Sequence, residues 1–180
     1  NDEIRRIYNF FDYADIHIKQ IVLSNYASSL AVLNEKESSL GAISIDIGKT
    51  KTFLAFTLDN QLIYFETNPI GVFNFTKDLS NVLQIDINEA EKIRKKMDKI
   101  DISKEINKKD FEFFQIYRSR AEELIDLIYH KIQITKYHSL VDNNIVYTGY
   151  GSKSLLFNKI IKKKFKISNC RLGSSLKING

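Results

Sequence analysis

The sequence predicts an α/β fold in which one β-sheet carries helices on both of its faces. Three runs of apolar and β-branched residues follow one another between Ala42 and Phe65, separated only by short polar turns, which is typical of a β-meander. After the meander, apolar residues recur mainly at helical spacing. One further short apolar run, Asn144–Thr148, is followed by glycines and another helical pattern. Strands and helices arranged in this order form layered α/β structures.

Length and composition indicate one folded domain. The chain has 180 residues, of which 43% are apolar, so there is enough material for a hydrophobic core. The formal net charge of +5 comes mostly from two lysine-rich segments, 92–99 and 159–166. A local basic excess is compatible with anionic lipid, nucleic acid or an acidic peptide, and does not distinguish between them.

The single cysteine, Cys170, excludes an internal disulfide and a cysteine-based zinc cluster, and favours a cytosolic protein. No apolar run reaches the roughly 20 residues that a membrane-spanning helix needs. The sequence begins NDEIRRIYNF, without Met, and stops at LKING. We therefore expect it to be a piece of a longer protein.

The first forty residues predict a helix, a strand and a second helix. Apolar residues at helical spacing predict a helix over Asp2–Tyr13, and the alternating IHIKQIVL predicts a short strand over Ile16–Leu23. Ser24 is expected to cap the next helix. In that helix Tyr26, Leu30 and Leu33 are expected to share one face.

The meander consists of Ile43–Ile47, Phe53–Leu58 and Leu62–Phe65, with an Asp59-Asn60 turn between the last two strands. Pro69 and Gly71 end it. The remaining predicted elements are helices over Phe73–Leu83, Asn88–Met97, Phe111–Ile134 and Ser152–Phe165, a charged connector over Asp98–Asp110 and a strand over Asn144–Thr148. Asn88 is expected to cap its helix, with Glu91 completing a capping box.

The first candidate site lies at the end of the first strand of the meander. Asp46 there precedes a tight polar turn that contains Gly48, Lys49, Thr50 and Thr52. Backbone N–H groups of such a turn can face phosphate oxygens, while the acid holds the water shell of Mg²⁺. The alternative is an ordinary hairpin turn, since Asp, Gly, Lys and Thr are common in turns.

A second candidate is Thr148–Ser152, where a buried strand leads into a helix. Small residues there allow a ligand to approach the backbone, although the same residues are common in a simple strand-to-helix turn. A third candidate is the group Glu91, Arg94 and Lys95, whose spacing puts them on one helical face and within reach of a ribose or base. Its alternative is a solvated face with ion pairs inside the helix. No spacing in the sequence indicates a metal cluster or a catalytic triad.

Seven segments share the order and spacing of the motifs of one known family. Tyr26–Gly41, YASSLAVLNEKESSLG, is similar to A-S-S-x-x-V-L-T-E-D-E-x-x-L-G, and Ile43–Phe56 falls where that family has I-D-I-G-G-G-T-T-D. The other five are Asn68–Leu83, Ala90–Met97, Ile116–Ile128, Val146–Ser152 and Cys170–Gly173. Together they resemble FtsA, the family of actin-like bacterial cell-division proteins.

The resemblance implies a ribonuclease H-like lobe of the actin superfamily, with a mixed sheet flanked by helices. Residues 1–40 would be a hinge region that leads in from a first lobe. Residues 41–97 and 115–180 would form the second large subdomain, and residues 98–114 a reduced small subdomain or connector.

The resemblance also implies a site for ATP and Mg²⁺. Asp46 would be the acid associated with the metal. The nucleotide would contact Asp46, Gly48, Lys49, Thr50 and Thr52 in the second phosphate loop, Glu91 and Arg94 beside the adenosine, and Gly149, Tyr150 and Gly151 in the adenosine loop. We expect at most a weak ATPase, no activity from this chain by itself, and no catalytic residue within it.

The implied partners are the C-terminal peptide of FtsZ, further copies of the protein in a protofilament, and the inner membrane, reached through a segment outside this chain. Arg120 and Glu123 would lie near the surface that receives the FtsZ peptide. No nucleic acid partner is expected. The protein would be cytoplasmic, at the inner face of the cell membrane at the division site.

Three positions depart from the family's pattern. Lys49 and Thr50 stand where the family has glycines, and Tyr150 replaces a glycine in the adenosine loop, where it would narrow the base site or stack on the base. The alternatives are another actin-fold ATPase or small-molecule kinase, and a pilus-assembly actin homologue. The segment Tyr26–Gly41 favours FtsA over both.

Overall fold

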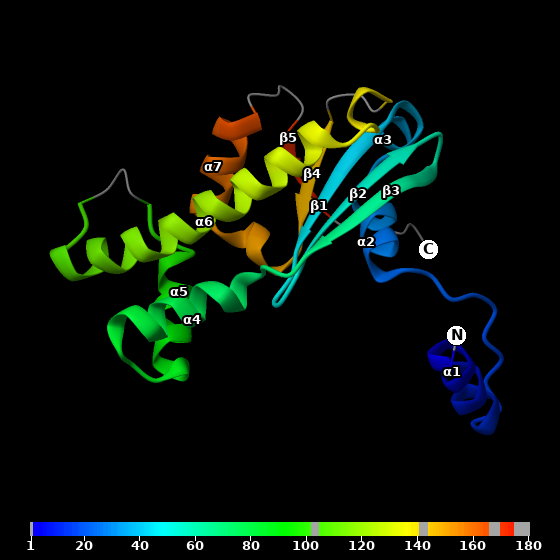
Figure 1. Ribbon diagram of the computed structural model, residues 1–180, viewed down its shortest axis with the longest axis horizontal. Coiled ribbons are helices and arrows are strands. Elements are labelled where there is room, and N and C mark those ends of the chain that lie inside the picture. Colours follow the sequence, from blue (N-terminus) through cyan, green and yellow to red (C-terminus); the bar gives the residue numbers. More distant parts are fainter. Residues whose placement is uncertain (1, 102–104, 141–143, 166–169, 175–180) are drawn as a thin grey trace.

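A computed structural model describes residues 2–101, 105–140, 144–165 and 170–174. Its centre is a five-stranded sheet with the strand order β3-β2-β1-β4-β5 (Figure 1). The strands are β1 (Ala42–Ile47), β2 (Thr52–Leu58), β3 (Gln61–Asn68), β4 (Ile145–Thr148) and β5 (Cys170–Leu172). The first three form the predicted antiparallel meander, while β4 pairs parallel to β1 and β5 parallel to β4. The sheet is therefore mixed, with β1 as its central strand.

Seven α-helices and two short 3-10 turns are found in the described residues. The α-helices are α1 (Asp2–Tyr13), α2 (Ser24–Val32), α3 (Glu35–Leu40), α4 (Val72–Leu83), α5 (Ile87–Met97), α6 (Lys108–Ile134) and α7 (Leu155–Phe165). The 3-10 turns are η1 (His138–Leu140) and η2 (Tyr150–Lys153). The predicted helix Ser152–Phe165 is thus split, because η2 ends at Lys153 and α7 begins only at Leu155.

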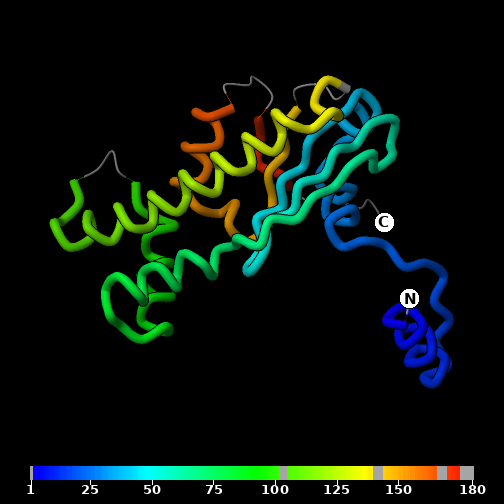
Figure 2. Tube along the Cα trace, in the orientation of Figure 1, coloured from blue at the N-terminus to red at the C-terminus, as the bar shows by residue number. Residues whose placement is uncertain are grey.

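The alternation of side chains along β1 explains why both faces of the sheet are covered. Ile43, Ile45 and Ile47 point to one face and belong to the large core. Helices α6 and α7 contribute to this core, which continues beyond the end of the sheet to α4 and α5 (Figure 2). Ala42 and Ser44 point to the other face, where α2 and α3 lie. A strand that is buried on both sides has almost no exposed residue, and β1 fits this description.

The turn between β2 and β3 shows how the sequence sets the hairpin. Asp59 and Asn60 have φ of 50° and 60°, the left-handed conformation that a two-residue hairpin turn requires and that Asp and Asn tolerate. Their backbone amides donate to Ser39 and Ser38 of α3, at 3.1 and 2.8 Å. The same turn therefore joins two strands and holds α3 on the sheet.

Two predictions about the helix starts are wrong. Asp86, not Asn88, caps α5: its carboxylate accepts the Asn88 backbone amide at 2.7 Å. Ser24 lies inside α2 and makes no cap. The sequence does contain one complete capping box that the prediction misses, at α3, where Asn34 and Glu37 bond to each other's backbone amides at 2.9 Å.

The N-terminal segment also differs from the prediction. Ile16–Leu23 is extended and mostly exposed but pairs with no described strand, so the predicted strand is wrong. In α2 the buried side chains include Asn25 and Ser29, whereas Leu30 is 44% exposed. A polar contact decides this orientation, because the Ser29 hydroxyl lies 2.5 Å from that of Ser44 on β1. Helix α1 has the predicted bounds, buries no side chain and stands away from the sheet (Figure 1).

Candidate nucleotide site

The hairpin between β1 and β2 closes without a glycine beyond Gly48. The Gly48 amide donates to the Lys51 carbonyl at 2.9 Å, and neither Lys49 nor Thr50 has a positive φ. The two residues that replace the family's glycines therefore form a turn that side-chain-bearing residues adopt without strain. Asp46, half-buried near the end of β1, makes no side-chain hydrogen bond or ion pair with a described residue.

The hairpin tip rests on the N-terminus of α4. The amides of Val72 and Phe73 donate to the carbonyls of Gly48 and Lys49, at 3.1 and 2.8 Å. Gly71 permits this approach, because a Cβ at that position would lie 2.6 Å from the Lys49 carbonyl. Two N–H groups that a helix normally leaves without a partner in its first turn are thus satisfied by the hairpin.

Thr52 faces the interior and not the loop. Its side chain is 1% exposed, and its hydroxyl donates to the Ile70 carbonyl at 2.7 Å. Of the predicted phosphate-loop residues, Thr52 thus helps to join β2 to the segment before α4. Lys49 and Thr50 are the ones whose side chains are exposed at the tip.

The second predicted loop lies directly against the first. Gly149 has φ of 88°, and a Cβ built there would fall 2.2 Å from Asp46 Oδ1. A Cβ on Gly151 would fall 2.4 Å from Ile47 Cγ2. Both positions therefore require glycine, Gly149 for its conformation and for space, Gly151 for space. The parallel pairing of β1 with β4 thus places the Asp46 and Gly149 segments side by side.

A pocket of about 300 Å³ opens beside these loops. It is lined by Lys49, Val72, Phe73, Glu91, Lys95 and Tyr150. Side chains from the hairpin, from α4, from α5 and from η2 meet there, so all three predicted candidate segments contribute to one site. Val72 and Phe73 are additions that the prediction misses. Their only signal in the sequence is their place immediately after Gly71, at the start of a helix.

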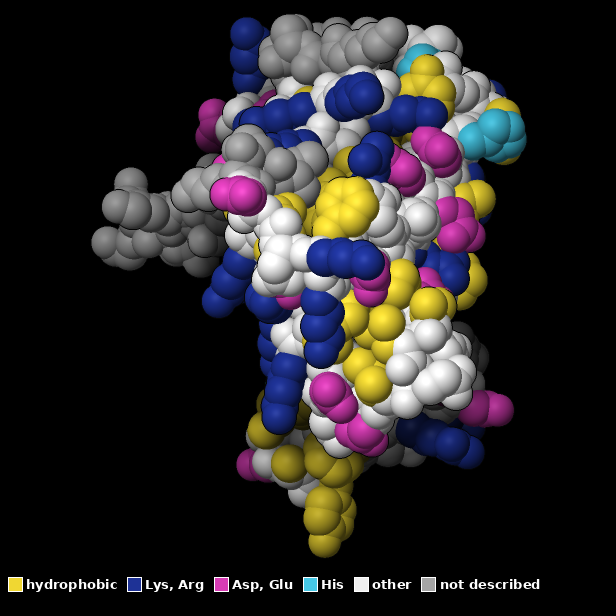
Figure 3. Space-filling model, turned by 90° about the vertical axis from the view of Figure 1, so that its left-hand side faces the viewer, with side chains coloured by type: hydrophobic (Ala, Val, Ile, Leu, Met, Phe, Trp, Pro, Cys, Tyr) yellow, Lys and Arg dark blue, Asp and Glu magenta, His cyan; other side chains and the backbone are white. Residues whose placement is uncertain are grey.

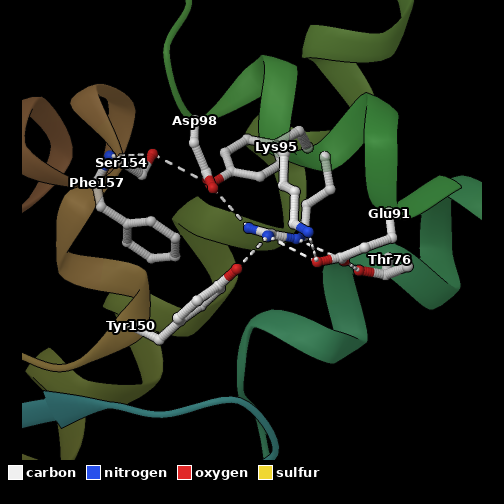
Figure 4. A network of polar contacts seen from close by, with 9 residues as sticks. Thr76, Glu91, Lys95, Asp98, Tyr150, Ser154 and Phe157 are labelled. Carbon is white, nitrogen blue, oxygen red and sulfur yellow. Dashed lines mark hydrogen bonds and ion pairs between the residues drawn. The ribbon is translucent and has the colours of Figure 1, made fainter. Parts of the chain in front are cut away.

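Arg94 does not line this pocket, and its side chain is only 1% exposed. Figure 4 labels the residues that surround it, among them Glu91, Asp98 and Tyr150. The Arg94 guanidinium holds Glu91 through two hydrogen bonds, of 2.8 and 3.0 Å, and Asp98 through one of 2.6 Å. The Thr76 hydroxyl donates to Glu91 at 2.6 Å, which links α4 to α5. Tyr117 of α6 donates to Asp98 at 2.5 Å. Three helices, α4, α5 and α6, are thus joined around one buried cation.

The network changes the ionisation of its members. The hydrogen bonds from Arg94, opposed by partial burial, lower the pKa of Glu91 from its ordinary 4.5 to about 2. Burial and the neighbouring Asp98 carboxylate raise the pKa of Tyr117 above its usual range. Burial opposes the charge on Arg94, but the hydrogen bonds that it donates to Glu91 and the charges of Asp98 and Glu91 raise its pKa all the same. Glu91 therefore faces the pocket as a carboxylate whose charge is already compensated.

The predicted partner-binding residues lie elsewhere. Arg120 on α6 holds Asp78 of α4 through two hydrogen bonds, of 2.5 and 3.0 Å, and Glu123 through one of 2.7 Å. These contacts join α4 to α6. Neither Arg120 nor Glu123 is among the residues that line the pocket.

A magnesium ion fits the donor set only in part. No group of three or more His, Cys, Asp or Glu side chains in the described residues is placed to hold a metal. Mg²⁺ bound with a nucleotide needs only one or two carboxylates, because phosphate oxygens and water complete its shell. Asp46, which lies beside Gly149, would supply one carboxylate, and its side chain has no hydrogen-bond or ion-pair partner among the described residues.

Sequence comparison identifies the family. The profile described as "Cell division protein FtsA" matches residues 43–174. The chain belongs to the FtsA family. Cell division protein FtsA of Rhizobium meliloti is 27% identical over 186 residues, which is 93% of this chain and 42% of that protein. FtsA of Bacillus subtilis is 36% identical over 84 residues, 47% of this chain and 19% of that protein.

The chain spans less than half the length of the FtsA relatives it matches. None of the helices in the described part of the chain has the length and apolar composition needed to cross a membrane.

Solved structures confirm the actin-like fold that the resemblance to FtsA implies. MreB5 of Spiroplasma citri bound to ADP superposes with a TM-score of 0.77 at 17% identity, over 96% of this chain and 60% of that one. The PilM-PilN type IV pilus biogenesis complex gives 0.66 at 14% identity, over 87% and 43%. At such identities the similarity is one of fold.

Proposed function

We propose that this chain is the nucleotide-binding second lobe of an FtsA-type cell-division scaffold. In this proposal residues 41–97 and 115–180 are the large subdomain, residues 98–114 belong to the small one, and residues 1–40 lead in from a first lobe. The bound nucleotide is ATP, with Mg²⁺ beside Asp46. The site acts in assembly and supports at most a weak ATPase.

The observation that carries the proposal is the convergence of the β1–β2 hairpin and the Gly149 loop on one pocket. Close backbone packing at Gly71, Gly149 and Gly151 leaves that pocket bordered by two ammonium groups, those of Lys49 and Lys95. Ammonium groups and an aromatic wall suit a nucleotide, which is an anion with a flat base. The ADP and AMPPNP complexes of the MreB5 structures, whose fold is similar, give further support.

The proposal extends to partners. The scaffold would tether the C-terminal peptide of FtsZ, polymerise with further copies of itself in a nucleotide-linked way, and reach the inner membrane through a segment outside this chain. It would therefore act at the cytoplasmic face of the division site. The FtsA family is the support for this part.

The test is binding of ATP with Mg²⁺ to the 180-residue chain, measured by thermal shift. ATP with Mg²⁺ is expected to raise the melting temperature of the unchanged chain. The Asp46→Ala variant is expected to lose this rise, because it lacks the carboxylate that would hold Mg²⁺. Asp12→Ala is the matched control, since Asp12 lies exposed on α1, away from the pocket. An equal shift in the Asp46→Ala variant would exclude the role assigned to Asp46. No shift in the unchanged chain would contradict the nucleotide site.

A further inference from the structure

Tyr150 is the only residue of its loop that can offer a side chain to the pocket. Its neighbours Gly149 and Gly151 both pack against β1 so closely that a Cβ would overlap the atoms of Asp46 or Ile47. Tyr150 itself is 46% exposed and lines the pocket. The loop thus has a fixed backbone and a single projecting ring.

Arg94 contacts that ring and its hydroxyl. The guanidinium carbon lies 5.3 Å from the ring centroid, and Nη2 donates to the Tyr150 hydroxyl at 3.3 Å. Because Glu91 and Asp98 hold the guanidinium in place, the ring rests on a cation that is itself immobile. A cation over an aromatic ring is an attractive contact, and here it fixes the position of the ring.

The other walls define the chemistry that the pocket suits. Val72 and Phe73 are apolar, while Lys49 and Lys95 carry ammonium groups. Two lysines and one carboxylate line the pocket, so its lining carries a net positive charge. Glu91 pairs with Arg94 and, at 3.8 Å, with Lys95. The volume of about 300 Å³ is at the lower end for small-molecule sites. A flat ring system with a short anionic chain matches these walls.

We infer that Tyr150 is the stacking surface for the base of the nucleotide and makes the site prefer purines to pyrimidines. The inference rests on the nucleotide function proposed above. Every base has a π face, but the larger ring system of a purine overlaps more of the tyrosine ring. Lys49 and Lys95 then interact with the phosphates. An all-glycine loop would offer the base only backbone atoms, whereas this loop offers it the ring of Tyr150.

The experiment is calorimetric titration of the 180-residue chain with ATP, CTP and inorganic tripolyphosphate. The unchanged chain is expected to bind ATP more tightly than CTP. In the Tyr150→Ala variant, ATP binding is expected to weaken about tenfold and the difference between ATP and CTP to disappear. Tripolyphosphate has no base, so its affinity is expected not to fall.

Two further variants serve as controls. Tyr150→Phe keeps the ring and loses only the hydroxyl, so it is expected to retain the preference for ATP even if the alanine variant folds poorly. Tyr13→Ala removes a tyrosine that is 95% exposed on α1 and is expected to change nothing.

The outcomes separate this inference from the function on which it rests. ATP binding that is equal or tighter in the Tyr150→Ala variant would show that the ring obstructs the base, and would overturn the inference alone. Loss of the ATP preference in Tyr150→Phe would overturn it as well, because the stacking surface is still present. A chain that binds none of the three ligands would overturn both the nucleotide function and the inference.

Discussion

Arg94 is a buried cation whose position depends on the two carboxylates of its own helix, Glu91 and Asp98. Removing one partner of a buried ion pair leaves a charge without compensation, which costs far more than an exposed pair contributes. The sequence shows Glu91 and Arg94 on one helical face, but the spacing is equally typical of a solvated surface. Burial by Tyr117 and Tyr150, which lie far away in the sequence, decides between the two.

We expect the ion pair to make stability depend on pH. Glu91 has a pKa near 4.5 when unfolded and about 2 when folded, so its contribution is fully present above pH 4.5 and is lost as the pH falls toward 2. Glu91→Gln is expected to lower the free energy of unfolding at pH 7 by about 2 kcal/mol, and the difference from the unchanged chain should shrink between about pH 5 and 2. Urea denaturation at several pH values measures it.

The matched control is Glu89→Gln, which removes the same charge from an exposed position of α5. It is expected to have little effect at any pH. A Glu91→Gln deficit that stays constant down to pH 2 would show that the pair is not what stabilises the site.

Helices and strands are predicted correctly where the local sequence pattern is compatible with one type of secondary structure. The meander, α1, α4 and the long α6 have apolar spacing or turn residues that leave no choice of structure, and they are predicted correctly to within a few residues. The strand at Ile16–Leu23 has the right alternation but no partner, because pairing is a property of the whole sheet. The sequence does not predict β5, whose three residues carry no pattern of their own.

The β1–β2 hairpin packs against the N-terminus of α4 through a close contact at Gly71, and this contact can be tested by mutation. Gly71 has φ of −137°, which any residue adopts, so Gly71→Ala changes only the space between α4 and Lys49. The new Cβ is expected to push the hairpin away and to lower the free energy of unfolding by about 1–3 kcal/mol. Amide exchange of Val72 and Phe73 should accelerate at the same time, because their acceptors move.

Asn81→Ala serves as the control, because it alters an exposed position of the last turn of α4, away from the hairpin. It is expected to leave both stability and the exchange of Val72 and Phe73 unchanged. Unaltered stability and exchange in the Gly71→Ala variant would mean that the hairpin does not depend on this contact.

At the scale of the whole molecule, two regions have surfaces that are suited to contact a partner. Helix α1 exposes Phe10 and Tyr13, and large exposed apolar side chains mark places where proteins meet a partner. At the opposite end, α4, α5 and the first half of α6 project beyond the sheet. In the view of that end, Lys and Arg side chains gather along one edge beside an apolar patch (Figure 3). Such a surface suits an acidic peptide with apolar anchors.

The last prediction concerns this projecting end and the proposed FtsZ contact. Arg120 lies on α6 and is paired with Asp78 and Glu123, so a peptide carboxylate would have to compete with them. An FtsZ C-terminal peptide is expected to bind the chain, and Arg120→Ala to weaken binding by roughly 1.5–3 kcal/mol. Glu123→Gln is expected to strengthen binding, because it removes one of the two carboxylates that compete for the guanidinium. Arg118→Ala is the control, because Arg118 lies on the same helix and, among the described residues, pairs with Glu122 alone. Fluorescence anisotropy of a labelled peptide gives the affinities.

Equal losses of affinity in the Arg118→Ala and Arg120→Ala variants would show that the effect comes from net charge alone. No binding by the unchanged chain would exclude FtsZ as a partner of this lobe.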